Sequence, residues 1–246
     1  MSRQRASILR ELGLGPLWRL RQQPATAAVQ EPIAEPETCG AAGAAASAVV
    51  DIADDRRAEI IARMDWPELE TAVADCQACA LCHGRKQAVL GVGDVQADWL
   101  FVGEGPGAEE DERGEPFVGQ AGKLLDAMLA AIDLRRGDNV YIANAVKCRP
   151  PGNRTPEVAE TTACWPYLER QIALLKPKII VALGRPAAQT LLRSEVKISA
   201  ARGRLFEFHG IPLIVTYHPA YLLRNLPDKA KAWEDLCFMR RTMRTL

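Results

Sequence analysis

Four short apolar segments alternate with helical patterns across the C-terminal two thirds of the chain, and this alternation constrains the fold most. Strands that alternate with helices are typical of a parallel sheet covered on both faces. The sequence therefore predicts an α/β fold, a three-layer α/β/α sandwich around a central, mostly parallel four-stranded sheet. The predicted strands are 99–103, 140–145, 179–183 and 213–216, and the predicted helices are 122–131, 156–175 and 186–192.

Three polar residues lie at, or just past, the ends of predicted strands: Glu104, Asn144 and His218. In open α/β sheets, ligands bind in the crevice outside the carboxyl ends of the strands. We therefore expect these three side chains to share one site.

The chain has seven cysteines and no apolar segment of secretory type after its basic N-terminus. This combination argues against a disulfide framework and favours metal or cluster ligation in a reducing cytoplasm. Cys76 and Cys79 form one close pair, whereas Cys148 and Cys164 are separated by fifteen residues.

Four sequence blocks together resemble the family 4 uracil-DNA glycosylases, the iron–sulfur branch of their superfamily. They are the Cys76-Gln-Ala-Cys pair, Phe101-Val-Gly-Glu-Gly-Pro-Gly, Asn144-Ala-Val-Lys-Cys-Arg-Pro-Pro-Gly-Asn-Arg with Cys164 beyond it, and Ile214-Val-Thr-Tyr-His-Pro. Each block alone is a weak signal, but their order and their placement at strand ends are specific. The resemblance covers residues 69–239.

The resemblance implies that four cysteines hold a [4Fe–4S] cluster: Cys76, Cys79, Cys148 and Cys164. A Cys₄ zinc site is the alternative, although zinc ribbons usually offer two close Cys-x-x-Cys pairs. Cys82 is then expected to be a buried free thiol and Cys237 a core residue. Because hydrolysis of an N-glycosidic bond transfers no electrons, we expect the cluster to be structural and to shape the loop that follows Lys147.

The same resemblance implies how uracil is held. The amide of Asn144 can donate and accept at once, which matches uracil O4 and N3–H and mismatches the amine of cytosine. Phe117 is expected to stack on the flipped base. His218 is expected to stabilise the charge that builds on the leaving base. Glu104 and Gly105 are expected to bind uracil, Glu104 chiefly through backbone groups.

Further residues are expected to meet the DNA or the attacking water. Leu222 or Leu223 is a candidate to fill the space left by the flipped base. Glu110 and Asp111 are, with Glu104, candidates to orient the water. The predicted phosphate contacts come from four basic residues: Lys147, Arg149, Arg154 and Arg224.

The resemblance does not reach the N-terminal quarter of the chain. We expect an amphipathic helix within residues 1–21, a low-complexity disordered linker over 22–64 that contains an unligated Cys39, and the glycosylase domain over 65–246. The helix is a candidate docking element for an unknown protein partner. No stretch approaches the ~20 apolar residues that span a bilayer. We further expect the protein to be cytoplasmic, to be nucleoid-associated in use and to be a monomer.

Charge is segregated along the chain although the net charge is zero. Residues 1–133 carry 12 Lys/Arg and 22 Asp/Glu, whereas residues 134–246 carry 19 and 9. A basic half suits a phosphate backbone, unless the two halves interleave in space and cancel.

The expected function is removal of uracil from single- and double-stranded DNA, as the first step of base excision repair. One alternative is a non-catalytic iron–sulfur protein that binds nucleic acid, which would need neither Asn144 nor His218. Another is a nucleotide-binding enzyme that uses the loop after Gly103. That loop lacks Gly-Lys-Ser/Thr, and Pro106 removes one of its backbone donors, so we rank this alternative low.

Overall fold

The computed structural model describes residues 50–246, with side chains from residue 56 onward. The predicted N-terminal helix and Cys39 lie outside this part of the chain. Within it, no helix is long and apolar enough to cross a membrane.

A six-stranded sheet in the order β1-β3-β2-β4-β6-β5 forms the centre of the fold. The four inner strands are parallel to one another, and both edge strands pair antiparallel to their neighbours. The predicted fold class is confirmed, but the predicted count of four strands is wrong because both edge strands were missed. The strands are β1 Val92–Gly93, β2 Trp99–Gly103, β3 Val140–Asn144, β4 Ile179–Leu183, β5 Leu205–Phe208 and β6 Ile211–Thr216.

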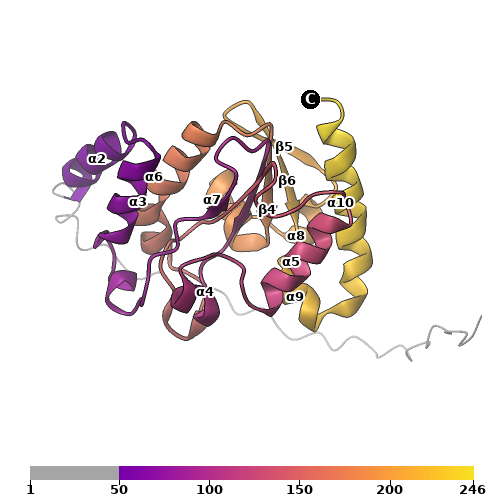
Figure 1. The fold of residues 1–246 in the computed structure, drawn as a ribbon, viewed down its shortest axis with the longest axis horizontal. Helices are drawn as coiled ribbons and strands as arrows, with labels where there is room; N and C mark the ends of the chain where they lie inside the picture. The colour runs from indigo at the N-terminus through magenta and orange to yellow at the C-terminus, as the bar shows by residue number, and fades with distance from the viewer. Residues whose placement is uncertain (1–49) are drawn as a thin grey trace, which may run out of the picture. The chain divides into compact units, whose positions relative to one another are not determined.

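Helices cover both faces of the sheet (Figure 1), with α6 and α7 on one face and α5, α9 and α10 on the other. The α-helices are α2 Val50–Ile61, α3 Trp66–Ala74, α4 Ala108–Arg113, α5 Gln120–Ala130, α6 Val158–Leu175, α7 Arg185–Leu192, α8 Ile198–Ala201, α9 Pro219–Arg224 and α10 Lys229–Met243. Short 3₁₀ helices are η1 Ala80–His83, η2 Pro151–Asn153 and η3 Leu226–Asp228.

The sheet is buried on both faces because its inner strands are mostly apolar; the polar residues Asn144 and Thr216 stand at the ends of β3 and β6. In β2, Leu100 and Val102 pack with α6 and α7, whereas Trp99 and Phe101 pack with α5 and α10. This is the side-chain alternation of a strand with two covered faces. The inner strands are therefore fixed in register, and the residues that follow them have fixed places.

Helices α2 and α3 pack against α6 in a third apolar cluster that also includes two of the cysteines, Cys148 and Cys164. A capping box between Asp65 and Glu68 starts α3. The predicted linker over 22–64 is wrong at its C-terminal end, because residues 50–61 form α2. Its last residue, Ile61, is 2% exposed; this single buried anchor was too weak a pattern to predict a helix.

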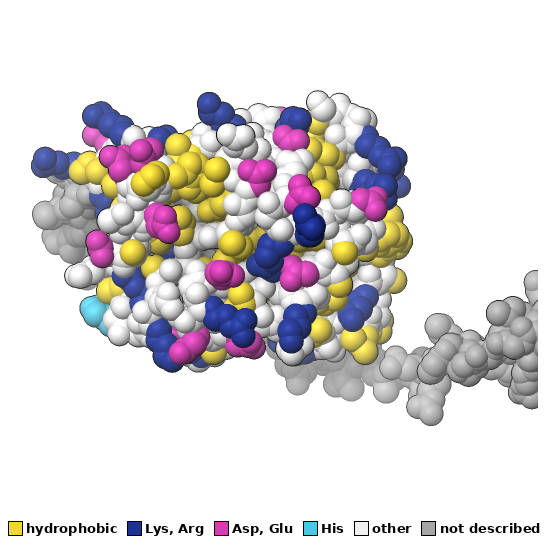
Figure 2. Space-filling model, in the orientation of Figure 1, with side chains coloured by type: hydrophobic (Ala, Val, Ile, Leu, Met, Phe, Trp, Pro, Cys, Tyr) yellow, Lys and Arg dark blue, Asp and Glu magenta, His cyan; other side chains and the backbone are white. Residues whose placement is uncertain are grey.

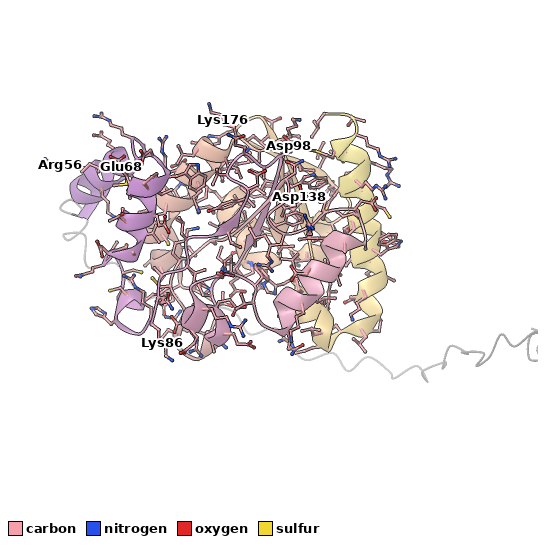
Figure 3. All side chains as sticks on the ribbon, viewed as in Figure 1. Arg56, Glu68, Lys86, Asp98, Asp138 and Lys176 are labelled. Carbon is pink, nitrogen blue, oxygen red and sulfur yellow. The ribbon has the colours of Figure 1, made fainter. Side chains whose placement is uncertain are left out.

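The carboxyl ends of the parallel strands meet at one edge of the sheet. Asp98 precedes β2 and Lys176 precedes β4; both lie at the upper edge in Figure 3, so the strands run toward the lower edge, where Lys86 is labelled. Figure 2 shows basic and acidic side chains interleaved on the face of the molecule that is turned to the viewer. The segregation of charge along the sequence therefore does not produce a single basic surface there.

Candidate active site

A cavity of about 780 Å³ lies at the carboxyl edge of the sheet. Its volume is in the range of small-molecule sites. The cavity brings together all five residues predicted to bind uracil, from four separate segments of the chain: Glu104, Gly105, Phe117, Asn144 and His218.

The ends of β2 and β3 place the first wall of this cavity. Gly103 is the register partner of Asn144, and the pairing continues one step further, where Val146 N–H donates to the Glu104 carbonyl at 3.2 Å. A Cβ on Gly103 would lie 2.4 Å from Asn144 Oδ1 and 2.5 Å from Phe117 Cζ. Only glycine lets the Asn144 amide and the Phe117 ring approach this backbone together.

The Asn144 side chain is 1% exposed, and its Oδ1 has no hydrogen-bond partner within the described chain. Leaving a buried amide oxygen unpaired costs about 1–3 kcal/mol. Since the amide also lines the cavity, a ligand that both donates and accepts would satisfy it.

Phe117 and His218 form the second wall, with ring centroids 5.5 Å apart and planes inclined by 30°. Phe117 is 6% exposed and has a left-handed backbone, φ 55°. Arg136 holds that backbone in place by donating to the carbonyls of Pro116 and Phe117, both at 2.7 Å. The ring is therefore presented to the cavity by a fixed loop.

The hydrogen bonds of His218 define its protonation state. His218 caps α9, and its Nδ1 accepts from Ala220 N–H at 3.1 Å, so a neutral ring carries its proton on Nε2. Burial, with a smaller contribution from the Arg224 cation, lowers the pKa of His218 to about 4, and Glu110 partly opposes this shift. At neutral pH the side chain is therefore an uncharged Nε2–H donor.

Glu104 is half-buried and lines the cavity directly after β2. Burial raises the pKa of its carboxyl above the ordinary value, while Thr155 and the Arg185 cation oppose this rise. Arg185 also lines the cavity, and the sequence analysis missed it. It follows β4 after a single glycine, so the rule that selected Glu104, Asn144 and His218 would have selected it too.

Two tyrosines at the cavity were also missed. Tyr217 and Tyr221 line it and stack on each other, with ring centroids 5.1 Å apart and planes inclined by 11°. Both flank the His218-Pro step in sequence, which was the available signal.

The two further candidates for water orientation lie in different surroundings. Glu110 lines the cavity, but its carboxylate already accepts three backbone N–H groups, from Gly107, Val118 and Gly119, at 2.9–3.1 Å. Asp111 is 2% exposed, accepts from the backbone N–H of Lys86 and does not line the cavity. The prediction for Asp111 is therefore wrong.

Of the predicted phosphate contacts, Lys147 is wrong. Its side chain is 1% exposed, and its ammonium donates to the Asn144 carbonyl and to Gln171. Nothing in the sequence around a basic loop indicates that one lysine points inward.

The three arginines in this set are closer to solvent. Arg154 is paired with Glu160 at 2.7 Å, and Arg149 donates to Asn153. Arg154 and Arg224 are both exposed and both line the cavity.

The two leucines of α9 differ sharply in exposure. Leu222 is 1% exposed and belongs to the core, whereas Leu223 is 40% exposed. Of the pair, Leu223 alone is available to a partner.

A second, smaller cavity lies between η1, the loop after β3, and α6. Four predicted ligands line it: Cys76, Cys79, Cys148 and Cys164. Cys82 lines it as well and is only partly buried, so the prediction that it is a buried thiol is wrong. Cys237 is likewise partly buried.

The chemistry of this cavity suits a centre that binds thiolates. Burial raises the pKa of Cys164 to about 12, and burial also raises the pKa of Cys148 and Cys79, so thiolates here need a positive partner. Arg85 donates to Cys148 Sγ at 3.1 Å, and Lys147 N–H donates to Cys164 Sγ at 3.3 Å. Within residues 56–246, no group of three or more His, Cys, Asp or Glu side chains is arranged for a single metal ion.

Comparisons with known proteins agree with this geometry. The profile of the Uracil DNA glycosylase superfamily matches residues 90–237. A type-4 uracil-DNA glycosylase from Pyrobaculum aerophilum is 43% identical over 181 residues, 70% of this chain and 92% of the relative. Those of Thermotoga maritima and Archaeoglobus fulgidus are 47% and 45% identical over 65% and 61% of this chain, and 83% and 79% of their own lengths. The chain thus belongs to the uracil-DNA glycosylase superfamily and, within it, to the type-4 enzymes.

Proposed function

We propose that this chain flips uracil out of DNA and hydrolyses its N-glycosidic bond with Asn144, Phe117 and His218 as the working side chains. The enzyme class follows from the family: the chain is a DNA glycosylase that acts in base excision repair. The observation that carries the residue assignment is the buried amide oxygen of Asn144 in the cavity, which has no partner in the part of the chain that the structure describes.

Base reading rests on the two walls of the cavity. A flipped uracil that stacks on Phe117 can donate N3–H to the Asn144 oxygen and accept from its NH₂ at O4. Cytosine offers an amine where uracil has O4, so it leaves the amide NH₂ without an acceptor. A buried polar group left unpaired disfavours the wrong base.

Bond cleavage rests on His218. As C1′–N1 breaks, the electron pair moves onto the base, and negative charge builds on its oxygens. A neutral Nε2–H donor aimed at O2 stabilises that charge without a proton transfer. A water oxygen then bonds to the cationic C1′ and releases its proton to solvent. Because this carbon is a strong electrophile, the water needs only weak activation, which Glu104 at the cavity mouth can supply.

Four of the five cysteines that line the second cavity, Cys76, Cys79, Cys148 and Cys164, are proposed as ligands of a [4Fe–4S] cluster. When bound, such a cluster supplies a rigid cross-link between distant segments. The chain's own part is to join η1, the loop after β3 and α6, and so to hold the loop next to Asn144.

Arg224, Arg149 and Arg154 are proposed to contact phosphates. Uracil in both single- and double-stranded DNA is the proposed substrate. The monomeric state, the nucleoid association and a protein partner for the N-terminal helix stay predictions.

The exposed Leu223 is proposed to fill the space that a flipped base leaves in a duplex. Replacing it with alanine is expected to slow uracil release from duplex DNA about 10-fold and from single strands less than about 3-fold, since extrusion from a stack costs a few kcal/mol. Single-turnover assays on both substrates check this. Leu226→Ala is the matched control, because Leu226 is also exposed, at 61%, in the neighbouring η3. Equal losses of rate on duplex and single-stranded DNA would contradict this role of Leu223.

The buried neutral His218 should make folding stability depend on pH. Its pKa is lowered from 6.5 to about 4, so between these values the unfolded chain binds a proton that the folded chain does not. Unfolding free energy should therefore fall as pH drops from 7 to 4.5, by about 2–3 kcal/mol from this group. Urea unfolding at both pH values, compared with His218→Gln, checks the sign. An equal pH dependence in the variant would refute it.

The direct test of the function is uracil release from an oligonucleotide with a single uracil, by wild type and by Asn144→Ala. Alkali-sensitive abasic sites formed by wild type and lost in the variant are expected. No uracil release from iron-loaded wild type would instead favour the non-catalytic binding protein, which keeps the cysteines and the basic loop but has no use for the amide.

A further inference from the structure

Lys147 is connected to both cavities. It lines the cysteine cavity, and its ammonium binds the main-chain carbonyl of Asn144, a residue that lines the other cavity. Its side chain is fully buried, and no carboxylate among the described residues pairs with its ammonium. Burying an unpaired ammonium costs several kcal/mol. A lysine in this position therefore needs a reason beyond packing, because methionine or leucine would fill the same space at lower cost.

The hydrogen bonds of the Lys147 ammonium connect the main chain of Asn144 to helix α6. Nζ donates to the main-chain carbonyl of Asn144 at 2.8 Å and to the side-chain oxygen of Gln171. Gln171 is itself fully buried and donates onward to the Leu90 carbonyl at 3.0 Å and to the Tyr141 hydroxyl at 3.2 Å. The main-chain carbonyl of Asn144 is thus connected through Lys147 to Gln171 in α6 and to Tyr141 in β3.

The main chain of Lys147 leads the other way, to the cysteine cavity. Its N–H donates to Cys164 Sγ at 3.3 Å, and its carbonyl accepts from Val89 N–H at 2.8 Å. Lys147 also lines the cysteine cavity and directly precedes Cys148. One residue therefore joins a proposed cluster ligand to the residue that reads the base.

We propose that Lys147 is a positioning residue that transmits the rigidity of the cysteine centre to Asn144 and so holds the reading amide in register with uracil. This inference rests on the proposed function, because it assigns the purpose of the lysine to base reading. The amide oxygen has no hydrogen-bond partner within the described chain, so its position depends on the main chain of Asn144.

The test uses the full-length, iron-loaded protein and the variant Lys147→Met, which keeps the length of the side chain and removes its donors and charge. We expect iron content and visible absorbance to stay at wild-type levels. We expect kcat to fall about 10- to 100-fold, as for misplacement of a reacting group, with KM changed less than about 3-fold. Lys178→Met, an exposed lysine beyond the opposite edge of the sheet, is the control for loss of charge alone.

A double-variant cycle separates positioning from a general structural role. If Lys147 acts through Asn144, the pair Lys147→Met/Asn144→Ala should lose no more activity than Asn144→Ala alone. Additive losses would overturn the proposal, and so would unchanged activity in Lys147→Met. The same cycle measured on free uracil binding by calorimetry gives a readout that does not need turnover, so a failure of the proposed enzyme activity is distinguished from a failure of this inference.

A second variant covers the case in which Lys147→Met loses its iron or fails to fold. Gln171→Leu leaves the cysteine segment and the lysine intact and removes one anchor of the ammonium. It is expected to lower kcat several-fold, again without adding to Asn144→Ala. Loss of iron or of folding in both variants would overturn the proposal in favour of a purely structural lysine.

Discussion

Replacing Asn144 with alanine is expected to lower the rate of uracil excision roughly 100- to 1000-fold, the range seen when one preorganised polar partner of a transition state is removed. The amide oxygen makes no hydrogen bond that the fold needs, since it is buried without a partner among the described residues. The loss should therefore appear in catalysis and base discrimination, with the melting temperature equal to or above that of wild type. Single-turnover excision and thermal unfolding of the same samples measure both.

Asn139→Ala supplies the opposite pattern as a matched control. Asn139 stands just before β3, at the other end of the strand that carries Asn144, and its amide oxygen accepts from Asp98 N–H at 2.6 Å. Its removal should cost stability and leave excision by the folded protein near wild type.

Glu104→Ala should lose less activity than Asn144→Ala or His218→Ala, because Glu104 is assigned chiefly backbone contacts and weak activation of water. If Glu104→Ala proved the most damaging, the ranking of roles would be reversed.

The inner part of the fold was predictable because its signals are local. Each inner strand is an apolar run followed by a glycine or a polar residue, and the helices between them are long enough to cross over. The edge strands carry no such signal: β1 has two residues, and β5 alternates exposed and buried positions next to a turn. Pairing with a neighbour, which the sequence does not display, makes them strands.

Site residues could be predicted where a reactive or hydrogen-bonding side chain stands at the end of a strand. They could not be predicted where the role depends on the direction in which a side chain points. Asn144 and His218 were found because both follow apolar runs. Lys147 was misassigned because a basic residue between basic neighbours predicts a surface contact. Its burial depends on an acceptor 24 positions away in α6, Gln171, and only the packed fold brings that acceptor close. Leu222 and Leu223 likewise differ only in which face of α9 they occupy.

Removal of Cys164 is expected to have the largest effect on stability. Cys164 is 8% exposed in the second turn of α6; it shares one cavity with Cys82 and with the other three proposed ligands, Cys76, Cys79 and Cys148. If the four proposed ligands hold a [4Fe–4S] cluster, Cys164→Ala removes a ligand and with it the cross-link between α6, η1 and the loop after β3. The free energy of metal binding at a structural centre contributes to the free energy of folding. We therefore expect the free energy of unfolding to fall by a value on the order of 4 kcal/mol, which is roughly 10 °C in Tm, together with loss of visible absorbance.

Cys82→Ala tests whether the ligand set has been assigned correctly. Cys82 lines the same cavity, is a thiol of the same kind and is only partly buried, so it differs from Cys164 chiefly in its proposed role. Iron content, absorbance and Tm of Cys82→Ala should stay at wild-type values; a loss equal to that of Cys164→Ala would mean that Cys82 is a ligand.

Elemental analysis of the same samples identifies the bound metal. One zinc per chain without visible absorbance would replace the cluster with a Cys₄ zinc site, whereas about four irons per chain, lost in Cys164→Ala and kept in Cys82→Ala, would establish both the cluster and its four ligands.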